Sequence, residues 1–69
     1  MRELQAEMLA NLMVIRDNPG VHLHPADCTI VSAAWRWARE NYAPETPGNI
    51  ASVRFYAREI DRIVRPLTT

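Results

Sequence analysis

Both tryptophans of this 69-residue chain lie in a single stretch, residues 30–42, in which the spacing of the apolar side chains predicts a helix. Around that helix Ala34 and Ala38 share one face, whereas Trp35 and Trp37 fall on opposite flanks of it. One face of a small core does not readily enclose two separate indole rings. We therefore expect this helix to have neighbours on both sides, either two in its own chain or one there and one in a second chain.

The length of the chain limits the stability that its own core can supply. A domain of this size buries only about 60% of the surface that its unfolded chain exposes, and its single core yields roughly 3 to 5 kcal/mol. Cys28 is the only cysteine, so no disulfide can join two parts of one chain. With 48% apolar residues the chain is too hydrophobic to be disordered. We expect a homodimer with a helical interface to cover the remaining apolar surface.

Several features of the sequence predict a cytoplasmic protein with no membrane association. No apolar run reaches the roughly 18 residues that span a bilayer, and the first residues lack the charged-then-apolar order of a signal peptide. A single thiol is typical of a reducing compartment. Every basic residue is arginine, and alanine and proline are frequent, as GC-rich coding tends to produce. We therefore expect the source to be a GC-rich bacterium, or a phage or other mobile element of one.

The sequence predicts an all-α domain of three helical segments. The connections between these segments contain proline. The sequence Asn18-Pro19-Gly20 ends the first segment, because a residue before proline is pushed out of the helical region. Pro25 suits the first turn of the second segment, and Pro66 is expected to end the third. The predicted helices lie at about residues 3–17, 25–43 and 49–65.

A broad apolar stripe on the first helix is the expected dimer interface. Its side chains recur at spacings of three and four residues and cover roughly half of the helix circumference. The alternative is an ordinary core helix whose stripe packs only within the chain. The stripe consists of Leu4, Met8, Leu9, Leu12, Met13 and Ile15.

The last helix carries the strongest candidate for a binding surface. Four arginines spaced four, four and three residues apart form an arginine ridge on the face opposite the core, and Phe55 projects beside it. Arginine and exposed aromatic side chains together are typical of protein interfaces. The alternative is a solvated face on which Glu59 pairs with Arg62 and Asp61 with Arg65. The arginine ridge comprises Arg54, Arg58, Arg62 and Arg65.

These features predict a non-catalytic regulatory or inhibitory protein that binds another protein and needs no cofactor. Phe55 and the arginine ridge would dock on the partner, with Trp35 or Trp37 as a buried anchor and with Arg36 and Arg39 extending the patch. The alternative is a small dimeric DNA-binding transcriptional regulator that sets the arginine ridge against phosphates. DNA is the less favoured partner, because the net charge is zero and the connections are too long for a helix-turn-helix.

Residues 22–28 hold four side chains of types that ligate zinc, namely His22, His24, Asp27 and Cys28. No second cluster supplies the usual paired spacing, and a structural zinc site needs four ligands in tetrahedral geometry. We therefore interpret this stretch as a turn and helix cap, and we predict neither a metal site nor a catalytic cysteine here.

Overall fold

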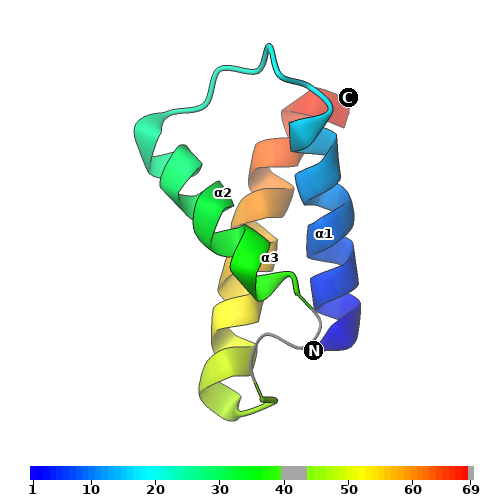
Figure 1. Ribbon diagram of the computed structural model, residues 1–69, viewed down its shortest axis with the longest axis vertical. Coiled ribbons are helices and arrows are strands. Elements are labelled where there is room, and N and C mark those ends of the chain that lie inside the picture. Colours follow the sequence, from blue (N-terminus) through cyan, green and yellow to red (C-terminus); the bar gives the residue numbers. More distant parts are fainter. Residues whose placement is uncertain (40–43, 69) are drawn as a thin grey trace.

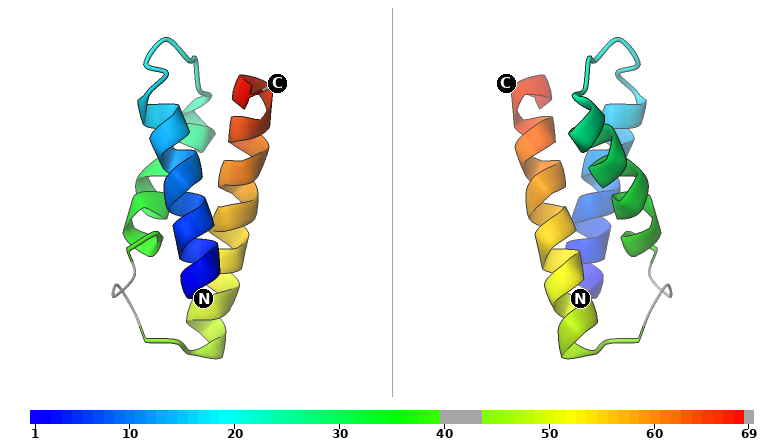
Figure 2. Two further views of the ribbon diagram at one scale, coloured as in Figure 1. Left: turned by 90° about the vertical axis from the view of Figure 1, so that its right-hand side faces the viewer. Right: turned by 90° about the vertical axis from the view of Figure 1, so that its left-hand side faces the viewer.

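The computed structural model describes residues 1–39 and 44–68. In these residues the chain forms three α-helices and no strand: α1 (Arg2–Arg16), α2 (Pro25–Trp37) and α3 (Pro47–Thr68). Helices α1 and α3 run side by side in the same direction, and α2 returns in the opposite direction, tilted across them (Figures 1 and 2). The prediction of an all-α domain with three helices is therefore confirmed.

Helix α2 is shorter than the sequence predicts. It ends at Trp37, with Ala38 in a turn and Arg39 in a bend, whereas the prediction extended it to residue 43. The carbonyl groups of Trp37 and Arg39 accept hydrogen bonds from the side chain of Gln5, so a residue of α1 takes part in ending the helix. The last four positions of the predicted helix, residues 40–43, lie outside the described residues.

Helix α3 is longer than predicted at both ends. The Thr46 hydroxyl oxygen accepts a hydrogen bond from the backbone N–H of Asn49 (3.2 Å), and Pro47 occupies the first turn. At the other end the helix continues through Pro66 to Thr68, so the prediction that Pro66 ends it is wrong. A proline in the last turn removes only one N–H donor, and few residues remain beyond it to be displaced.

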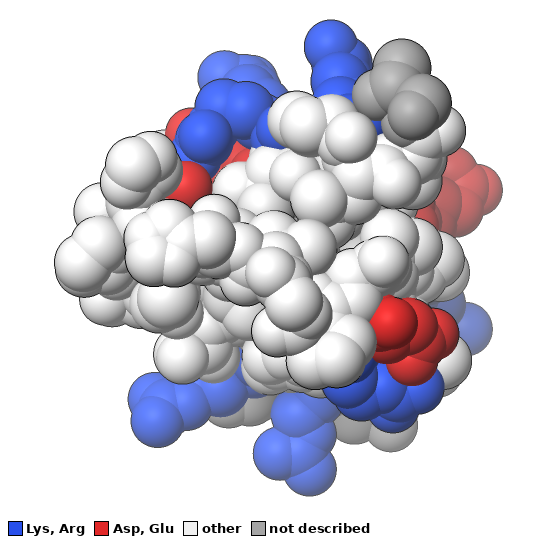
Figure 3. All heavy atoms as spheres, turned by 90° about the horizontal axis from the view of Figure 1, so that it is seen from above, with Lys and Arg blue, Asp and Glu red and all other residues white. Residues whose placement is uncertain are grey.

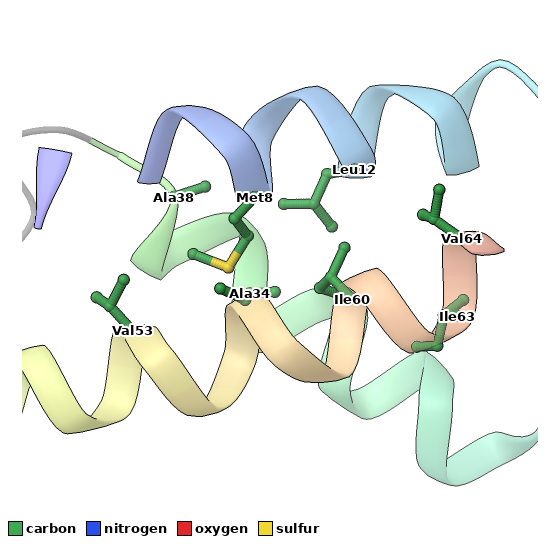
Figure 4. Packing of buried hydrophobic residues seen from close by; sticks show 9 residues of the cluster. Met8, Leu12, Ala34, Ala38, Val53, Ile60, Ile63 and Val64 are labelled. Atoms are coloured by element: carbon green, nitrogen blue, oxygen red, sulfur yellow. The ribbon is translucent and has the colours of Figure 1, made fainter. Parts of the chain in front are cut away.

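The core lies where α3 meets the other two helices (Figure 4). Met8 and Leu12 of α1 and Ile60 of α3 are fully buried there, together with Ala34 of α2, and Ala38 just beyond the end of α2 is buried as well. Ala34 and Ala38, which the sequence places on one face, therefore both pack in the core. The buried cluster comprises Met8, Leu12, Ala34, Ala38, Val53, Ala57, Ile60, Ile63 and Val64.

The apolar stripe of α1 is divided between the core and the surface. Met8 and Leu12 pack inside the single chain, and two further members, Leu4 and Ile15, are half-buried against the same core. Only Leu9 and Met13 of the stripe project to solvent, each with 39% of its surface exposed. Most of the predicted dimer interface is thus engaged within one chain, and pairing of two chains stays a prediction.

Each tryptophan of α2 lies against a different part of its own chain. Trp37 stacks on Tyr56 of α3, whereas Trp35 lines a cleft together with Leu9 of α1. Helix α2 thus contacts both α1 and α3 within its own chain, and a further neighbour from a second chain stays a prediction. Among the described residues, none of the helices combines the length and apolar character that a bilayer span requires.

Candidate protein-interaction surface

Three aromatic side chains follow one another where the end of α2 meets α3. The rings of Trp37 and Tyr56 are stacked, with centroids 6.4 Å apart and planes at 19°. The ring of Phe55 meets that of Tyr56 edge-on, with centroids 5.1 Å apart and planes at 81°. Both separations lie within the range over which aromatic rings attract each other. We call Trp37, Tyr56 and Phe55 the aromatic row.

The aromatic row ends in an exposed ring because of the helical repeat. Tyr56 lies on the core side of α3, and the next residue in either direction is turned by about 100° around the helix. Phe55 therefore cannot follow Tyr56 into the core, and half of its surface (50%) is exposed. The predicted exposure of Phe55 is confirmed, and its contact with Tyr56 fixes the direction in which the ring points.

Arg62 of the arginine ridge joins α3 to the first turn of α2. Its Nη2 lies 2.9 Å from Oδ1 of Asp27 and 2.8 Å from Oε2 of Glu59, and its Nε donates to the same Glu59 oxygen at 3.0 Å. The hydrogen bond to Asp27 and then that to Glu59 raise the pKa of the Arg62 guanidinium above its ordinary value. Asp27 also suits the positive end of the α2 dipole. Arg62 is thus a positioned cation at the start of α2, whereas the aromatic row lies at the other end of that helix.

The other members of the arginine ridge lie in different surroundings. Arg65 pairs with Asp61, with 2.9 Å between Nη2 and Oδ2. Arg54 and Arg58 line a hollow of about 360 Å³ between α1 and α3, together with the acidic side chains of Glu7 and Asp61. Both ion pairs predicted on this helix are therefore present. The ridge is therefore a set of arginines interleaved with acids.

The remaining predicted contact residues lie on α2 and just beyond it. Trp37 belongs to the aromatic row, but Trp35 and Arg39 line the cleft between α1 and α2. Arg36 is exposed on α2. The structure therefore connects Phe55 with Trp37 through Tyr56, places Arg62 against the first turn of α2, and assigns Trp35 to another surface.

Gln5 is a central residue that the sequence reading missed. It is 2% exposed, and its Nε2 donates to the carbonyl oxygens of Trp37 (3.2 Å) and Arg39 (2.8 Å). Its position in the sequence carries a signal, because Gln5 falls near the middle of the stripe that Met8 and Leu12 define. A polar residue at the centre of an apolar helix face indicates a buried hydrogen-bonding role.

Two of the four side chains of zinc-ligating type in residues 22–28 make contacts within the chain. The Asp27 carboxylate bonds to Arg62, and Cys28 Sγ makes a weak contact, 3.9 Å long, with the carbonyl oxygen of Leu23. In the part of the chain that the structure describes, no three His, Cys, Asp or Glu side chains gather closely enough to hold a metal ion.

The charged side chains are spread around the molecule. Figure 3 shows the end formed by the α1–α2 connection and the last turn of α3, where arginine side chains project at opposite edges and the middle carries no charge. Acidic side chains lie next to some of these arginines. With a formal net charge of zero, the molecule does not present one strongly cationic face at this end.

The chain matches no known protein family, no curated protein and no solved structure. The geometry of its surfaces is therefore the basis on which its function is inferred.

Proposed function

We propose that this chain is a non-catalytic protein-binding domain, a small regulator or inhibitor, whose aromatic row forms the centre of the docking surface. The observation that carries the proposal is Phe55, half-exposed and yet held edge-on against Tyr56. Covering an exposed aromatic ring gains about 25 cal/mol for each Å² removed from water. A ring that is already oriented loses less conformational freedom on binding.

The neighbours of Phe55 support a protein as the partner. Tyr, Trp and Arg are the residue types that most often dominate the energy of protein interfaces, and the aromatic row contains Tyr56 and Trp37 as well as Phe55. Arg58 is exposed on α3 three residues from Phe55, and side chains at this spacing on a helix are neighbours. We expect the partner to offer an apolar pocket for Phe55, bordered by hydrogen-bond acceptors.

The chemistry of these groups supports binding over catalysis. Aromatic rings supply apolar area, and a guanidinium donates hydrogen bonds but is not deprotonated in proteins. Such groups recognise a partner without transferring protons or forming covalent bonds. A regulator or inhibitor that acts by occupying a surface of another protein needs only this kind of contact.

DNA is the second candidate partner, because Arg54 and Arg58 are both exposed and lie four residues apart on α3. Glu7 and Asp61 line the same hollow, however, and a phosphate backbone approaching these arginines would meet their negative charge. We therefore favour a protein over DNA as the binding partner. Duplex binding that falls steeply with salt, and that Arg54→Ala with Arg58→Ala removes, would reverse this order.

The test compares Phe55→Ala with Met13→Ala, because Met13 is also an exposed apolar residue but lies on α1. Tagged wild-type protein captures the partner from cells that express it, and the purified partner is then titrated against each variant by calorimetry. We expect Phe55→Ala to weaken binding about 30-fold or more, as for other central interface residues. Arg58→Ala should add to this loss, while Met13→Ala leaves the affinity unchanged. Wild-type affinity in the Phe55→Ala variant, with helicity intact by circular dichroism, would show that the proposal is wrong.

A further inference from the structure

The outer face of α1 carries exposed apolar side chains at helical spacing. Leu9 and Met13 each keep 39% of their surface exposed, and Ala6 and Ala10 are exposed beside them. Residues 6, 9 and 13 are three and four positions apart, so their side chains form one stripe along the helix. We call Ala6, Leu9, Ala10 and Met13 the α1 seam. An apolar stripe at this spacing is typical of a helix that pairs with another helix.

The α1 seam is sterically complementary to an antiparallel copy of itself. When a twofold axis passes between residues 9 and 10, Ala6 stands level with Met13 of the second copy, and Leu9 stands level with Ala10. A large side chain then meets a small one at each step along the two helices. Large side chains that alternate with small ones across facing positions interdigitate and let the helices approach closely.

The cleft between α1 and α2 offers space for Met13 of the second copy. Ala6, Leu9 and Trp35 line this cleft, which has a volume of about 360 Å³. Because Ala6 stands level with Met13 of the second copy, the methionine side chain meets the mouth of the cleft. Methionine is flexible and fills irregular apolar spaces. The twofold axis makes this contact twice, once in each chain.

The charges at the two ends of α1 favour the antiparallel direction. Arg2 of one copy stands level with Asp17 of the other, whereas in a parallel pair Arg2 would face Arg2 and Asp17 would face Asp17. Arg2 also interacts within its own chain, and Asp17 pairs with Arg16 at 3.5 Å, so the attraction across the pair adds to existing contacts. Glu3 and Arg16 lie at the same ends, and each end of the pair therefore holds two arginines and two acids.

We propose that two copies of this chain pair through the α1 seam with their α1 helices antiparallel, and that Met13 of each copy enters the cleft of the other. Of the six residues predicted for a dimer interface, Leu9 and Met13 belong to this seam. The seam does not include the aromatic row, so the pair presents two copies of the protein-binding surface proposed above. One helix from each chain makes the contact, and we expect a dissociation constant of about 10 to 100 µM.

Analytical ultracentrifugation over a range of about 5 to 500 µM measures the pairing. Met13→Glu places a carboxylate in the apolar seam and should weaken the association at least about tenfold. Phe55→Glu makes the same change at an exposed apolar residue of α3 and should leave the association unchanged. By NMR, the indole N–H signal of Trp35 should shift with protein concentration, because Trp35 lines the cleft. Circular dichroism confirms that both variants remain helical.

Cysteine cross-linking tests the direction of the pair, in a Cys28→Ser background that removes the native thiol. Ala10→Cys lies beside the twofold axis, close to its own copy, and should form a disulfide-linked dimer on oxidation with copper phenanthroline. Ala6→Cys is about 10 Å from its own copy along the helices, too far for a disulfide. It should instead cross-link to Met13→Cys when the two variants are mixed.

Three results would overturn the proposal. The first is a wild-type chain that stays monomeric at about 500 µM. The second is association that Met13→Glu leaves unchanged, or that Phe55→Glu weakens equally, because the pairing would then use another surface. The third is Ala6→Cys that cross-links to itself as readily as Ala10→Cys does, because the two helices would then be parallel.

Discussion

The side-chain amide of Gln5 donates a hydrogen bond to the carbonyl oxygen of Trp37, 32 residues further along the chain, at 3.2 Å. The same Nε2 also bonds to the carbonyl oxygen of Arg39 at 2.8 Å. Carbonyl groups at the end of a helix have no partner within it. Gln5 therefore caps the C-terminal end of α2 from a different helix, and this cap connects the first helix to the second.

Replacing Gln5 should destabilise the domain through this cap. Gln5→Met keeps a similar volume but leaves the two carbonyl oxygens without their donor, so we expect the free energy of unfolding to fall by about 1 to 3 kcal/mol. Gln5→Glu should lower the free energy of unfolding further at neutral pH. A carboxylate cannot donate a hydrogen bond to the two carbonyl oxygens, and its negative charge would lie near the negative end of the α2 dipole. Urea denaturation measures both variants, and the exposed Glu7→Gln is the control. A Gln5→Met variant as stable as the wild type would contradict the capping role.

Removing the charge of Arg62 should lower the stability, because Arg62 links α3 to Asp27 in α2. We expect the urea midpoint of Arg62→Met to fall below that of Arg65→Met, since Arg65 pairs with Asp61 inside α3. The difference should shrink at high salt, because the pair is only partly shielded from solvent. Equal midpoints for the two variants would show that the link between the helices contributes nothing.

The contribution of the Arg62 charge to the free energy of unfolding should not change across the neutral pH range. The pKa of Arg62 is raised in the folded state by Asp27 and Glu59, so its contribution is fully present below the pKa of the unfolded chain. On the alkaline side that contribution is lost only as the pH rises through the folded-state pKa, which for an arginine lies in strongly alkaline solution. The stability difference between wild type and Arg62→Met, measured in urea from neutral to alkaline pH, should therefore persist until strongly alkaline pH. A difference that disappears near neutral pH would mean that Arg62 is not its source.

Truncating a fully buried side chain of either α1 or α3 should unfold the domain. Leu12→Ala and Ile60→Ala each remove a fully buried side chain, at a cost of about 2 to 5 kcal/mol. That cost is comparable with the roughly 3 to 5 kcal/mol that a core of this size supplies, so both variants should be largely unfolded by circular dichroism. Ile60→Val should remain folded, with a loss of about 0.5 to 1.5 kcal/mol. A folded Leu12→Ala monomer would show that the stability comes from elsewhere.

The aromatic row should divide into a stabilising and an exposed part. Tyr56 is half-buried between contacts with Trp37 and Phe55, so Tyr56→Ala should lower the free energy of unfolding by about 2 to 4 kcal/mol. Phe55→Ala removes one edge contact and should cost less than about 1 kcal/mol. Thermal and urea unfolding measure both changes. If Phe55→Ala lowers the free energy of unfolding as much as Tyr56→Ala does, the ring of Phe55 serves to stabilise the fold and not to dock on a partner.

The helices and their buried faces follow from the sequence because both depend on local spacing. Ala34 and Ala38 on one side of α2, and Ile60 on α3, are recognisable from the 3.6-residue repeat. The ion pairs from Glu59 to Arg62 and from Asp61 to Arg65 are likewise predictable, since their members are one helical turn apart.

What the sequence could not show depends on contacts between distant residues. The end of α2 is set partly by Gln5, and the second carboxylate on Arg62 comes from Asp27, 35 residues away. The stacking of Trp37 on Tyr56 similarly requires the orientation of α2 on α3. The prediction that Pro66 ends α3 was wrong for a different reason. A proline in the last turn of a helix disrupts fewer backbone hydrogen bonds than one in the middle, so the helix continues through it.

The parallel course of α1 and α3 has a practical consequence for handling the molecule. Their shared direction places the last turn of α3 at one pole of the long axis, while the N-terminus lies toward the other (Figure 1). A fusion partner or surface anchor attached after α3 would extend along that axis, away from the flanks of the bundle. Immobilising the protein through this pole would therefore leave both the aromatic row and the cleft between α1 and α2 accessible to soluble molecules.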